Sequence, residues 1–226
     1  MKDDASVHAL SVPVEYGGLE MTITPVAIET DRGVVLVDVG PAGAVDALAA
    51  QLDSVGHSLA VCWLVVCTHH DGDHVGGLAE LRERTDVVVA AHRDEAPFVD
   101  GRRRPQKASD GRYLPTPVDV ELVDGVRFAS AAGPVRVVAT PGHTPGHLSL
   151  YLPDHALCLA GDALVADDSE RPLAGPKPEY TADLDRARES VERLAELDVD
   201  HTVCYHGGHV AQGSARIREI ADEMTA

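Results

Sequence analysis

Aromatic residues, long apolar runs and lysine are scarce in this chain of 226 residues. Only eight side chains are Phe, Trp or Tyr, so its core must be built from Val, Leu, Ala and Ile, which a hydrophobic content of 44% allows. No apolar run approaches the roughly 20 residues that a membrane-spanning helix needs, and no charged and apolar leader opens the chain. We therefore expect a soluble, cytoplasmic protein with a single domain over residues 1–226.

Cysteine is also rare, and the four cysteines lie without close paired spacing in or beside apolar segments. They are Cys62, Cys67, Cys158 and Cys204. We expect them to be small buried side chains in the reduced state, in preference to a disulfide framework or a zinc knuckle.

Positive charge is scarce as well. Thirty-seven acidic residues oppose nineteen basic ones, for a net charge of −18, and only three of the bases are Lys. Molar salt shortens the reach of such self-repulsion to a few ångströms, so the composition is haloarchaeal in character, with an acidic protein from an ordinary cell as the alternative. Nucleic acid is a disfavoured partner for this charge, and we expect a small-molecule substrate.

What the chain does have is a dense group of polar residues after an apolar run. The sequence Thr-His-His-Asp-Gly-Asp-His occupies residues 68–74, directly after residues 63–67, which read Trp-Leu-Val-Val-Cys. Imidazoles and carboxylates are costly to crowd where the dielectric constant is low, unless a positive charge holds them. These ligands suit zinc, iron or manganese, so the motif predicts a metal pair, with a solvated turn as the alternative.

Three more predicted strands end in a group that can bind a metal. These groups are His143, Asp162 and His206, and each has a glycine next to it. If the four strand ends converge on one edge of a sheet, they form a polydentate metal site.

This order of motifs resembles the metallo-β-lactamase superfamily, whose pattern is His-x-His-x-Asp-His followed by a His, an Asp and a His. The likeness extends over roughly residues 20–210 and includes a strand-Asp-x-Gly turn at residues 36–40, where Asp38 would orient the ligands from behind. It implies an α/β fold of the αββα four-layer sandwich type. The hydrolase that it implies uses two divalent ions, with zinc expected first and iron or manganese as alternatives.

The resemblance also implies a ligand set of seven residues. These are His69, Asp71 and His143 for one ion, Asp73, His74 and His206 for the other, and Asp162 as the bridge. Asp73 is the expected catalytic residue, because it would also hold the attacking hydroxide in line.

Position 71 departs from the family pattern, which has a histidine there. A carboxylate oxygen of Asp71 and Nδ1 of a histidine are both two bonds from Cβ, so Asp71 can reach the same ion. The extra negative charge makes the site a weaker Lewis acid and favours harder metals such as iron or manganese. A register slip would make His70 the ligand instead; because neighbours in an extended segment point to opposite sides, we expect replacement of His70 to have little effect.

Candidate substrate contacts come from two stretches rich in proline and glycine. Within residues 100–117 the bases Arg102, Arg103, Arg104 and Lys107 would either bind a carboxylate or phosphate of the substrate or belong to a solvated loop. Tyr180, at the end of the stretch 167–181, is a candidate for the pocket wall.

The remaining histidines divide into two groups. His147 and His209 lie within four residues of predicted ligands and are candidates for supporting contacts or substrate contacts. No constellation is evident in the sequence around the others, which we expect to be surface or capping residues: His8, His57, His92, His155 and His201.

The function expected from these residues is hydrolysis of a small ester, thioester or lactone by a hydroxide that bridges two metal ions. The substrate class rests on fold analogy alone. The chain does not show the long carboxy-terminal helical extension of glyoxalase II enzymes, nor the tyrosine that acyl-homoserine lactonases carry beyond the bridging Asp, where residues 163–165 read Ala-Leu-Val. Two alternatives are a di-iron redox protein with a separate electron donor, as in flavodiiron proteins, and a ribonuclease of the tRNase Z or cleavage-factor kind.

Hydrophobic periodicity and turn residues predict two similar halves. In the first we expect strands at 22–29, 34–38, 62–67 and 87–91, and helices at 42–55 and 76–83. In the second we expect strands at 126–130, 135–139, 148–152, 156–160 and 202–205, and helices at 183–196 and 212–224.

Overall fold

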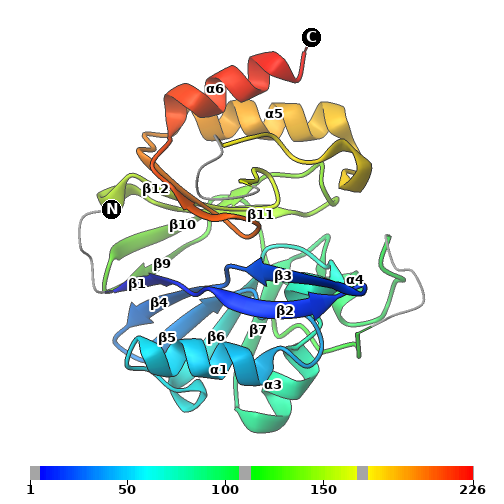
Figure 1. Cartoon of the computed structure of the whole chain (residues 1–226), viewed down its shortest axis with the longest axis vertical. Coiled ribbons are helices and arrows are strands. Elements are labelled where there is room, and N and C mark those ends of the chain that lie inside the picture. The colour runs from blue at the N-terminus through cyan, green and yellow to red at the C-terminus, as the bar shows by residue number, and fades with distance from the viewer. Residues whose placement is uncertain (1–5, 107–112, 167–172, 226) are drawn as a thin grey trace. The chain divides into compact units, whose positions relative to one another are not determined.

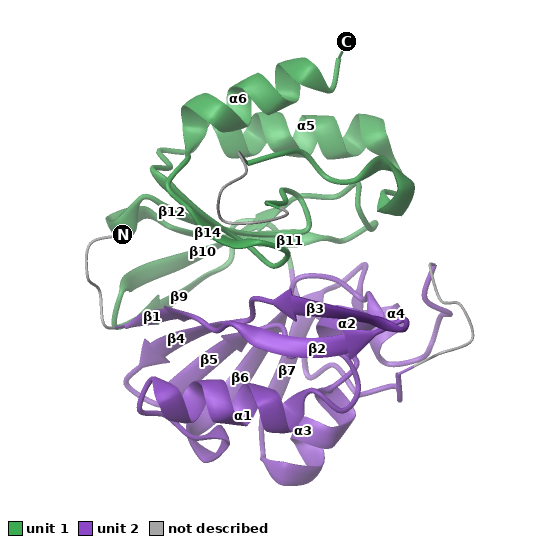
Figure 2. Cartoon of the chain, in the orientation of Figure 1, with its two compact units in different colours: residues 1–4, 123–226 green, residues 5–122 purple. Residues whose placement is uncertain are grey.

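The computed structural model describes residues 6–106, 113–166 and 173–225, which belong to two compact units (Figures 1 and 2). Unit 2 comprises residues 5–122, and unit 1 comprises residues 1–4 and 123–226. Each unit is built on a six-stranded sheet with helices, so the α/β prediction is confirmed. The expectation of a single domain over the whole chain stays a prediction.

Unit 2 contains a mixed sheet and a separate two-stranded ribbon. The sheet has the order β1 (Val7–Ala9), β4 (Val26–Thr30), β5 (Gly33–Val37), β6 (Cys62–Cys67), β7 (Val88–His92) and β8 (Val120–Leu122). The ribbon pairs β2 (Val12–Tyr16) with β3 (Leu19–Ile23). The helices are α1 (Val45–Ser54), η1 (Leu59–Val61), α2 (Gly72–Val75), α3 (Leu78–Arg84) and α4 (Ala96–Val99). Strands β1, β4 and β5 pair antiparallel, whereas β5 to β8 are parallel.

The central parallel strands of unit 2 are short apolar runs, and most of their residues are buried. Four of the five residues of β5 and the last three of β6 are buried, as is typical of central strands in a parallel sheet. Helix α1 buries Val45, Leu48 and Leu52, which recur at helical spacing and form one apolar stripe.

Unit 1 has a mainly antiparallel sheet with two long helices. The strand order is β14 (Gly208–Val210), β13 (His201–Cys204), β12 (Leu157–Gly161), β11 (Leu148–Leu152), β10 (Gly133–Ala139) and β9 (Arg127–Ser130). The helices are η2 (Pro153–His155), η3 (Pro178–Tyr180), α5 (Leu184–Ala195) and α6 (Ser214–Glu223). Only β12 and β13 pair in parallel among neighbouring described strands of this sheet.

Helices α5 and α6 lie side by side against the sheet of unit 1 (Figure 1). Val191 and Leu194 of α5 and Ile217 and Ile220 of α6 share one buried cluster with residues of β10 to β13. Asp183 caps α5 as predicted, because its carboxylate accepts the backbone N–H of Arg186 at 3.0 Å.

The four cysteines are buried free thiols, which confirms their expected state. Burial raises the pKa of the Cys62 and Cys158 thiols to about 12, so neither ionises near neutral pH. Among the described residues, no helix combines the length and apolar character that crossing a bilayer requires.

The largest error of the secondary-structure prediction is the strand expected at 22–29. Strand β3 ends at Ile23 and β4 begins at Val26, because Pro25 cannot donate a backbone hydrogen bond and its carbonyl instead accepts from Leu10 at 2.8 Å. The prediction also missed several elements of three to five residues: β1, β2, α4, β8 and β14.

Candidate metal centre

Three adjacent parallel strands of unit 2 place polar groups at one edge of the sheet. Asp38 directly follows β5, the motif of residues 68–74 follows β6, and Glu95 lies three residues after β7. Because β5, β6 and β7 run in the same direction, their carboxyl ends meet at the same edge, where α/β proteins commonly bind ligands.

Asp38 is the centre of a buried hydrogen-bond network at this edge. Its backbone has a φ of 60°, an unusual conformation for a non-glycine residue, and its N–H donates to the Val66 carbonyl at 3.1 Å. The carboxylate accepts the Thr68 backbone N–H at 2.8 Å, the Thr68 hydroxyl at 2.7 Å and His74 Nδ1–H at 2.8 Å. Asp38 therefore fixes both Thr68 and the His74 ring.

This network also determines which nitrogen of each imidazole carries the proton. The single hydroxyl proton of Thr68 goes to Asp38, so Thr68 Oγ1 accepts Nδ1–H of His69 at 3.0 Å. Both His69 and His74 thus carry a proton on Nδ1, which makes Nε2 the nitrogen that can bind a metal. Nε2 of His69 lies 3.4 Å from Asp71 Oδ2, and Nε2 of His74 lies 3.9 Å from Asp73 Oδ2.

Backbone contacts hold the short helix α2 in place next to Asp38. The carbonyl of His74 accepts the N–H groups of Val39 at 2.9 Å and of Gly40 at 3.2 Å. The approach is close enough to require glycine, since a Cβ at Gly76 would lie 2.6 Å from the Ala42 nitrogen. This packing explains the glycine that follows the motif.

His70 lies in a different environment from the histidines on either side of it in the motif. Its backbone N–H donates to Glu95 Oε2 at 2.9 Å, and its Nδ1 also contacts that carboxylate. Its Nε2 accepts the backbone N–H of Gln106 at 3.3 Å, and its ring stacks on Phe98 with centroids 4.2 Å apart. Both ring nitrogens therefore contact protein groups, which favours Asp71 over His70 as a ligand; that assignment stays a prediction.

Unit 1 brings its three predicted ligands together. Asp162 Oδ2 lies 3.4 Å from His143 Nε2 and 3.6 Å from His206 Nε2. The strands explain this meeting, because β10 and β12 are both antiparallel to β11 and β13 is parallel to β12, so the loops after β10, β12 and β13 lie at the same edge. Asp162 is thus the central residue of this set; its role as a bridging ligand stays a prediction.

Helix α5 holds the loop that carries His143. Gly142 has a φ of 138°, and a Cβ there would lie 2.3 Å from the Ala187 nitrogen. Its carbonyl accepts the Asp183 N–H at 3.0 Å, and the Ser190 hydroxyl donates to the Pro141 carbonyl at 2.6 Å. Glycine is required here because the loop lies directly against the first turn of the helix.

The backbone beside His206 is held in a similar way. Gly207 has a φ of 105°, and a Cβ there would lie 1.1 Å from the Ala166 carbonyl oxygen, so a larger residue would displace the segment. The Ala166 N–H donates to the His206 carbonyl at 2.9 Å. The segment that follows Asp162 therefore also positions His206.

His147, which the sequence left without a firm role, positions Asp162. Its Nε2 accepts the backbone N–H of Asp162 at 3.0 Å, so the neutral ring carries its proton on Nδ1, which donates to Thr140 Oγ1 at 2.9 Å. Thr140 lies 3.0 Å from Ser149 Oγ, and Ser149 donates to the Ala160 carbonyl at 3.0 Å. This buried relay fixes the end of β12, where Asp162 begins.

Tyr16 is a residue near the predicted ligands of unit 2 that sequence reasoning missed. Burial and then the charges of Asp73 and Asp71 raise the pKa of its hydroxyl, and a Cβ at Gly72 would lie 2.7 Å from that hydroxyl. It belongs to β2, a half-exposed ribbon strand that the sequence analysis did not predict, although its apolar and polar residues alternate.

The predicted substrate contacts show less organisation. Arg102 pairs with Asp100 at 2.6 Å and with Glu121 at 3.2 Å, so carboxylates already balance its charge. Arg103 lies over the Phe98 ring, 5.9 Å from its centroid, and Arg104 is exposed. Lys107 lies outside the described residues, and Tyr180 of unit 1 is 58% exposed. All five remain predictions.

The donor groups in both units fit divalent transition metals. Imidazole and carboxylate are the ligands that zinc, iron and manganese accept, and His69, His74 and His143 are almost completely buried. In unit 2 the protein also supplies a fixed acceptor for each Nδ1–H, which is the usual support of a metal-binding histidine.

Comparison with known proteins finds a matching family and related enzymes. The sequence profile of a family described as "Metallo-beta-lactamase superfamily" matches residues 22–206. A protein of Bacillus subtilis (strain 168) named "Probable metallo-hydrolase YflN" is 31% identical over 221 residues, which cover 85% of this chain and 83% of that protein. A hydroxyacylglutathione hydrolase of Ruegeria pomeroyi is 34% identical over 195 residues, which cover 84% of this chain and 66% of that enzyme.

Solved structures share the fold. A metallo-beta-lactamase family protein from Thermus thermophilus superposes with a TM-score of 0.76 at 25% identity, over 97% of this chain and 79% of that one. A metallo-beta-lactamase from Pontibacter korlensis gives a TM-score of 0.75 at 18% identity, over 100% of this chain and 97% of that one. The chain spans about half the length of other hydroxyacylglutathione hydrolases, for example 50% of the enzyme from Cereibacter sphaeroides.

Proposed function

The chain belongs to the metallo-beta-lactamase superfamily and is a metal-dependent hydrolase, and we propose that it cleaves a small ester, thioester or lactone with the seven predicted ligands holding two ions. The family profile and the related hydrolases support metal-dependent hydrolysis. The assignment of the ligands, the number of ions and the substrate class are the proposal.

The observation that carries this proposal is the orientation of the imidazoles in unit 2. A buried histidine with a merely structural role can use either nitrogen, but here Asp38 and Thr68 hold Nδ1–H of two neighbouring rings at 2.8 and 3.0 Å. Both rings therefore offer Nε2, as metal-binding histidines do when a carboxylate or hydroxyl lies behind them. Unit 1 has a comparable support, because His147 fixes the backbone of Asp162.

Divalent ions bound by these ligands would supply Lewis acidity and lower the pKa of a bound water. Within the protein, Asp73 is the residue that we propose to orient the attacking water, because its carboxylate lies beside His74 and is only partly exposed. Asp38, Thr68 and His147 act as positioning residues through hydrogen bonds alone. Tyr16 offers a hydroxyl that could contact a substrate near Asp71 and Asp73.

The names of the relatives support the proposed substrate class. One related enzyme acts, by its name, on a hydroxyacylglutathione, which supports an acyl compound as substrate. The chain covers 66% of that enzyme, so we propose the acyl group and not the glutathione part. Zinc is the proposed metal. The carboxylate of Asp71 adds negative charge to the site, which would allow it to accept iron or manganese as well.

An exchange of Asp162 for Asn tests the metal assignment, with Asp198→Asn as the matched control in unit 1, since the Asp198 side chain is exposed. Elemental analysis of chelator-free protein and hydrolysis of ester, thioester and lactone panels are the two measurements. We expect Asp162→Asn to lose bound metal and at least about 100-fold in kcat/KM, as loss of a ligand should cost no less than damage to its supporting shell. Full metal content with normal turnover would refute the assignment.

A further inference from the structure

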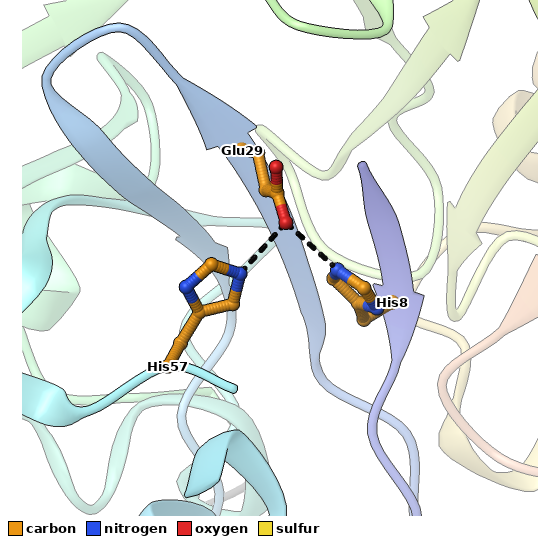
Figure 3. A group of neighbouring side chains, drawn as sticks. All are labelled: His8, Glu29 and His57. Atoms are coloured by element: carbon orange, nitrogen blue, oxygen red, sulfur yellow. Dashed lines mark hydrogen bonds and ion pairs between the residues drawn. The ribbon is translucent and has the colours of Figure 1, made fainter. Parts of the chain in front are cut away.

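A second group of possible metal ligands lies in unit 2, and none of its members belongs to the set proposed for hydrolysis. His8 on β1, Glu29 on β4 and His57 after α1 point toward one another (Figure 3). The sequence separates them by 21 and 28 residues, so we expected both histidines to be surface or capping residues. The structure corrects this expectation, because both contact the same carboxylate.

Strand pairing places His8 and Glu29 on the same face of the sheet. His8 is opposite Ala27 in the antiparallel pair of β1 and β4, and Glu29 lies two residues after Ala27. Side chains two residues apart on a strand share a face, so His8 and Glu29 are diagonal neighbours within reach of each other. The backbone N–H of Glu29 donates to the Ser6 carbonyl at 2.9 Å, which holds this part of the pairing.

His57 is positioned by the way in which α1 ends. The N–H of His57 donates to the Leu52 carbonyl at 2.9 Å, and that of Gly56 donates to the Asp53 carbonyl at 3.1 Å. With a φ of 85° at Gly56, these two bonds form a Schellman motif, which turns the chain sharply after the helix. The backbone that carries His57 is therefore fixed by hydrogen bonds.

The ligand atoms already converge on one point. Glu29 Oε1 lies 3.2 Å from His8 Nε2 and 2.8 Å from His57 Nε2, and all three atoms lie within 4.8 Å of one another. Neighbouring ligand atoms of a tetrahedral zinc ion are about 3.3 Å apart when the bonds are about 2.0–2.1 Å long. Small rotations of three partly buried side chains would supply this spacing.

We propose that His8, Glu29 and His57 form a second metal site, which binds one zinc ion through two imidazoles and one carboxylate. Three protein ligands with water as the fourth make a complete tetrahedral shell. The ion would lie near the end of α1, whose last turn has no basic residue and whose carbonyl end favours positive charge. It would connect β1, β4 and the end of α1, and so stabilise unit 2.

A zinc titration of chelator-treated protein tests this site. A chromogenic chelator that competes for zinc reports how much of the ion the protein binds. The variants are His8→Gln, Glu29→Gln and His57→Gln, and His155→Gln is the control, because it removes a partly buried histidine of unit 1. We expect the wild type and His155→Gln to bind one zinc ion per chain more than the three variants, whose affinity at this site falls by at least about 100-fold. The residues proposed for hydrolysis are unchanged in all four variants.

Thermal unfolding provides a second measurement, with Glu29→Gln as the variant that keeps the size and hydrogen-bonding capacity of the side chain. At a zinc concentration about 100 times the dissociation constant of this site, the melting temperature of the wild type should rise about 6 °C more than that of Glu29→Gln. An anomalous zinc peak at bonding distance from the three ligand atoms in a crystal would support the site. Equal zinc stoichiometry in the wild type and the three variants, or an equal loss in His155→Gln, would overturn it and leave a hydrogen-bonded triad.

Discussion

His70 and His74 follow the same strand, both are completely buried, and each has its Nδ1 on a buried carboxylate. Their partners come from the strands on either side of β6, since Asp38 follows β5 and Glu95 lies just beyond β7. The two rings differ in their second nitrogen. Nε2 of His70 accepts a backbone N–H from Gln106, whereas Nε2 of His74 is on the side of Asp73.

Under the proposed assignment, burial and a carboxylate partner do not by themselves identify a metal ligand. In His70 the protein supplies a partner to both nitrogens, so the ring connects the motif to the segments around Glu95 and Gln106. In His74 the carboxylate of Asp38 sets the tautomer by accepting Nδ1–H, so Nε2 lies toward Asp73, the carboxylate proposed to bind the same ion. If the proposed assignment is right, the group next to the second nitrogen separates a structural histidine from a ligand.

The largest effects should come from replacing each histidine by Ala. Each variant loses a hydrogen bond to a charged group, so both should lower the free energy of unfolding of the metal-free protein, by about 3 kcal/mol. Only His74→Ala should also lose at least about 100-fold in metal affinity and kcat/KM. Chemical denaturation in chelator and competitive metal titration measure the two quantities.

If either Ala variant fails to fold, the matched variants His70→Gln and His74→Gln repeat this test. If His70→Gln loses metal as His74→Gln does, the assignment of Asp71 over His70 is wrong. From the sequence we expected that replacing His70 would have little effect. The contacts of His70 with Glu95 and Phe98 change this for folding, because their loss should lower the stability of the protein. For metal binding the expectation of little effect is unchanged.

The sequence shows the position of the motif well but not its partners. β6 was predicted at its observed bounds, 62–67, because an apolar run that ends in a group of polar residues is a strong local signal. Asp162, by contrast, was assigned as a bridge only by resemblance, and its support through His147 and Thr140 follows from packing that no spacing reveals.

Contacts between distant segments account for the rest of what was missed. Glu95 is 25 residues from His70 along the chain, and its role depends on the parallel pairing of β6 with β7. Strand β2, which carries Tyr16, was missed although Val12, Val14 and Tyr16 alternate with Pro13 and Glu15, because a proline inside such a run argues against a strand. The contact between His8 and Glu29 likewise depends on the register of β1 against β4, which the sequence alone does not specify.

Replacing the carboxylates that contact the two histidines, Asp38 and Glu95, tests the same comparison more sharply. We expect effects of intermediate size. In Asp38→Asn one amide N–H₂ must face a donor, either Thr68 or Nδ1–H of His74, so the ring orientation is disturbed. We expect metal affinity to fall by about 10- to 100-fold, as for other losses behind a ligand. Glu95→Gln should leave the affinity unchanged and lower stability only, which isothermal titration and denaturation together would show. Equal losses of affinity would mean that both carboxylates support the metal.

The smallest effect should come from Tyr113, which contacts the backbone of His70. Its hydroxyl donates to the His70 carbonyl at 2.8 Å, and burial is the main reason that its pKa is raised. Tyr113→Phe removes this hydrogen bond and the longer contact of the same hydroxyl with the Phe98 carbonyl at 3.4 Å, and it keeps the ring, so the free energy of unfolding should fall by about 1 kcal/mol. Because the bond reaches the backbone of His70 and not a proposed ligand, metal affinity and kcat/KM should stay at wild-type values. A clear fall in metal affinity would show that the His70 backbone transmits strain to Asp71, and the division between a structural and a metal-binding histidine would then be too strict.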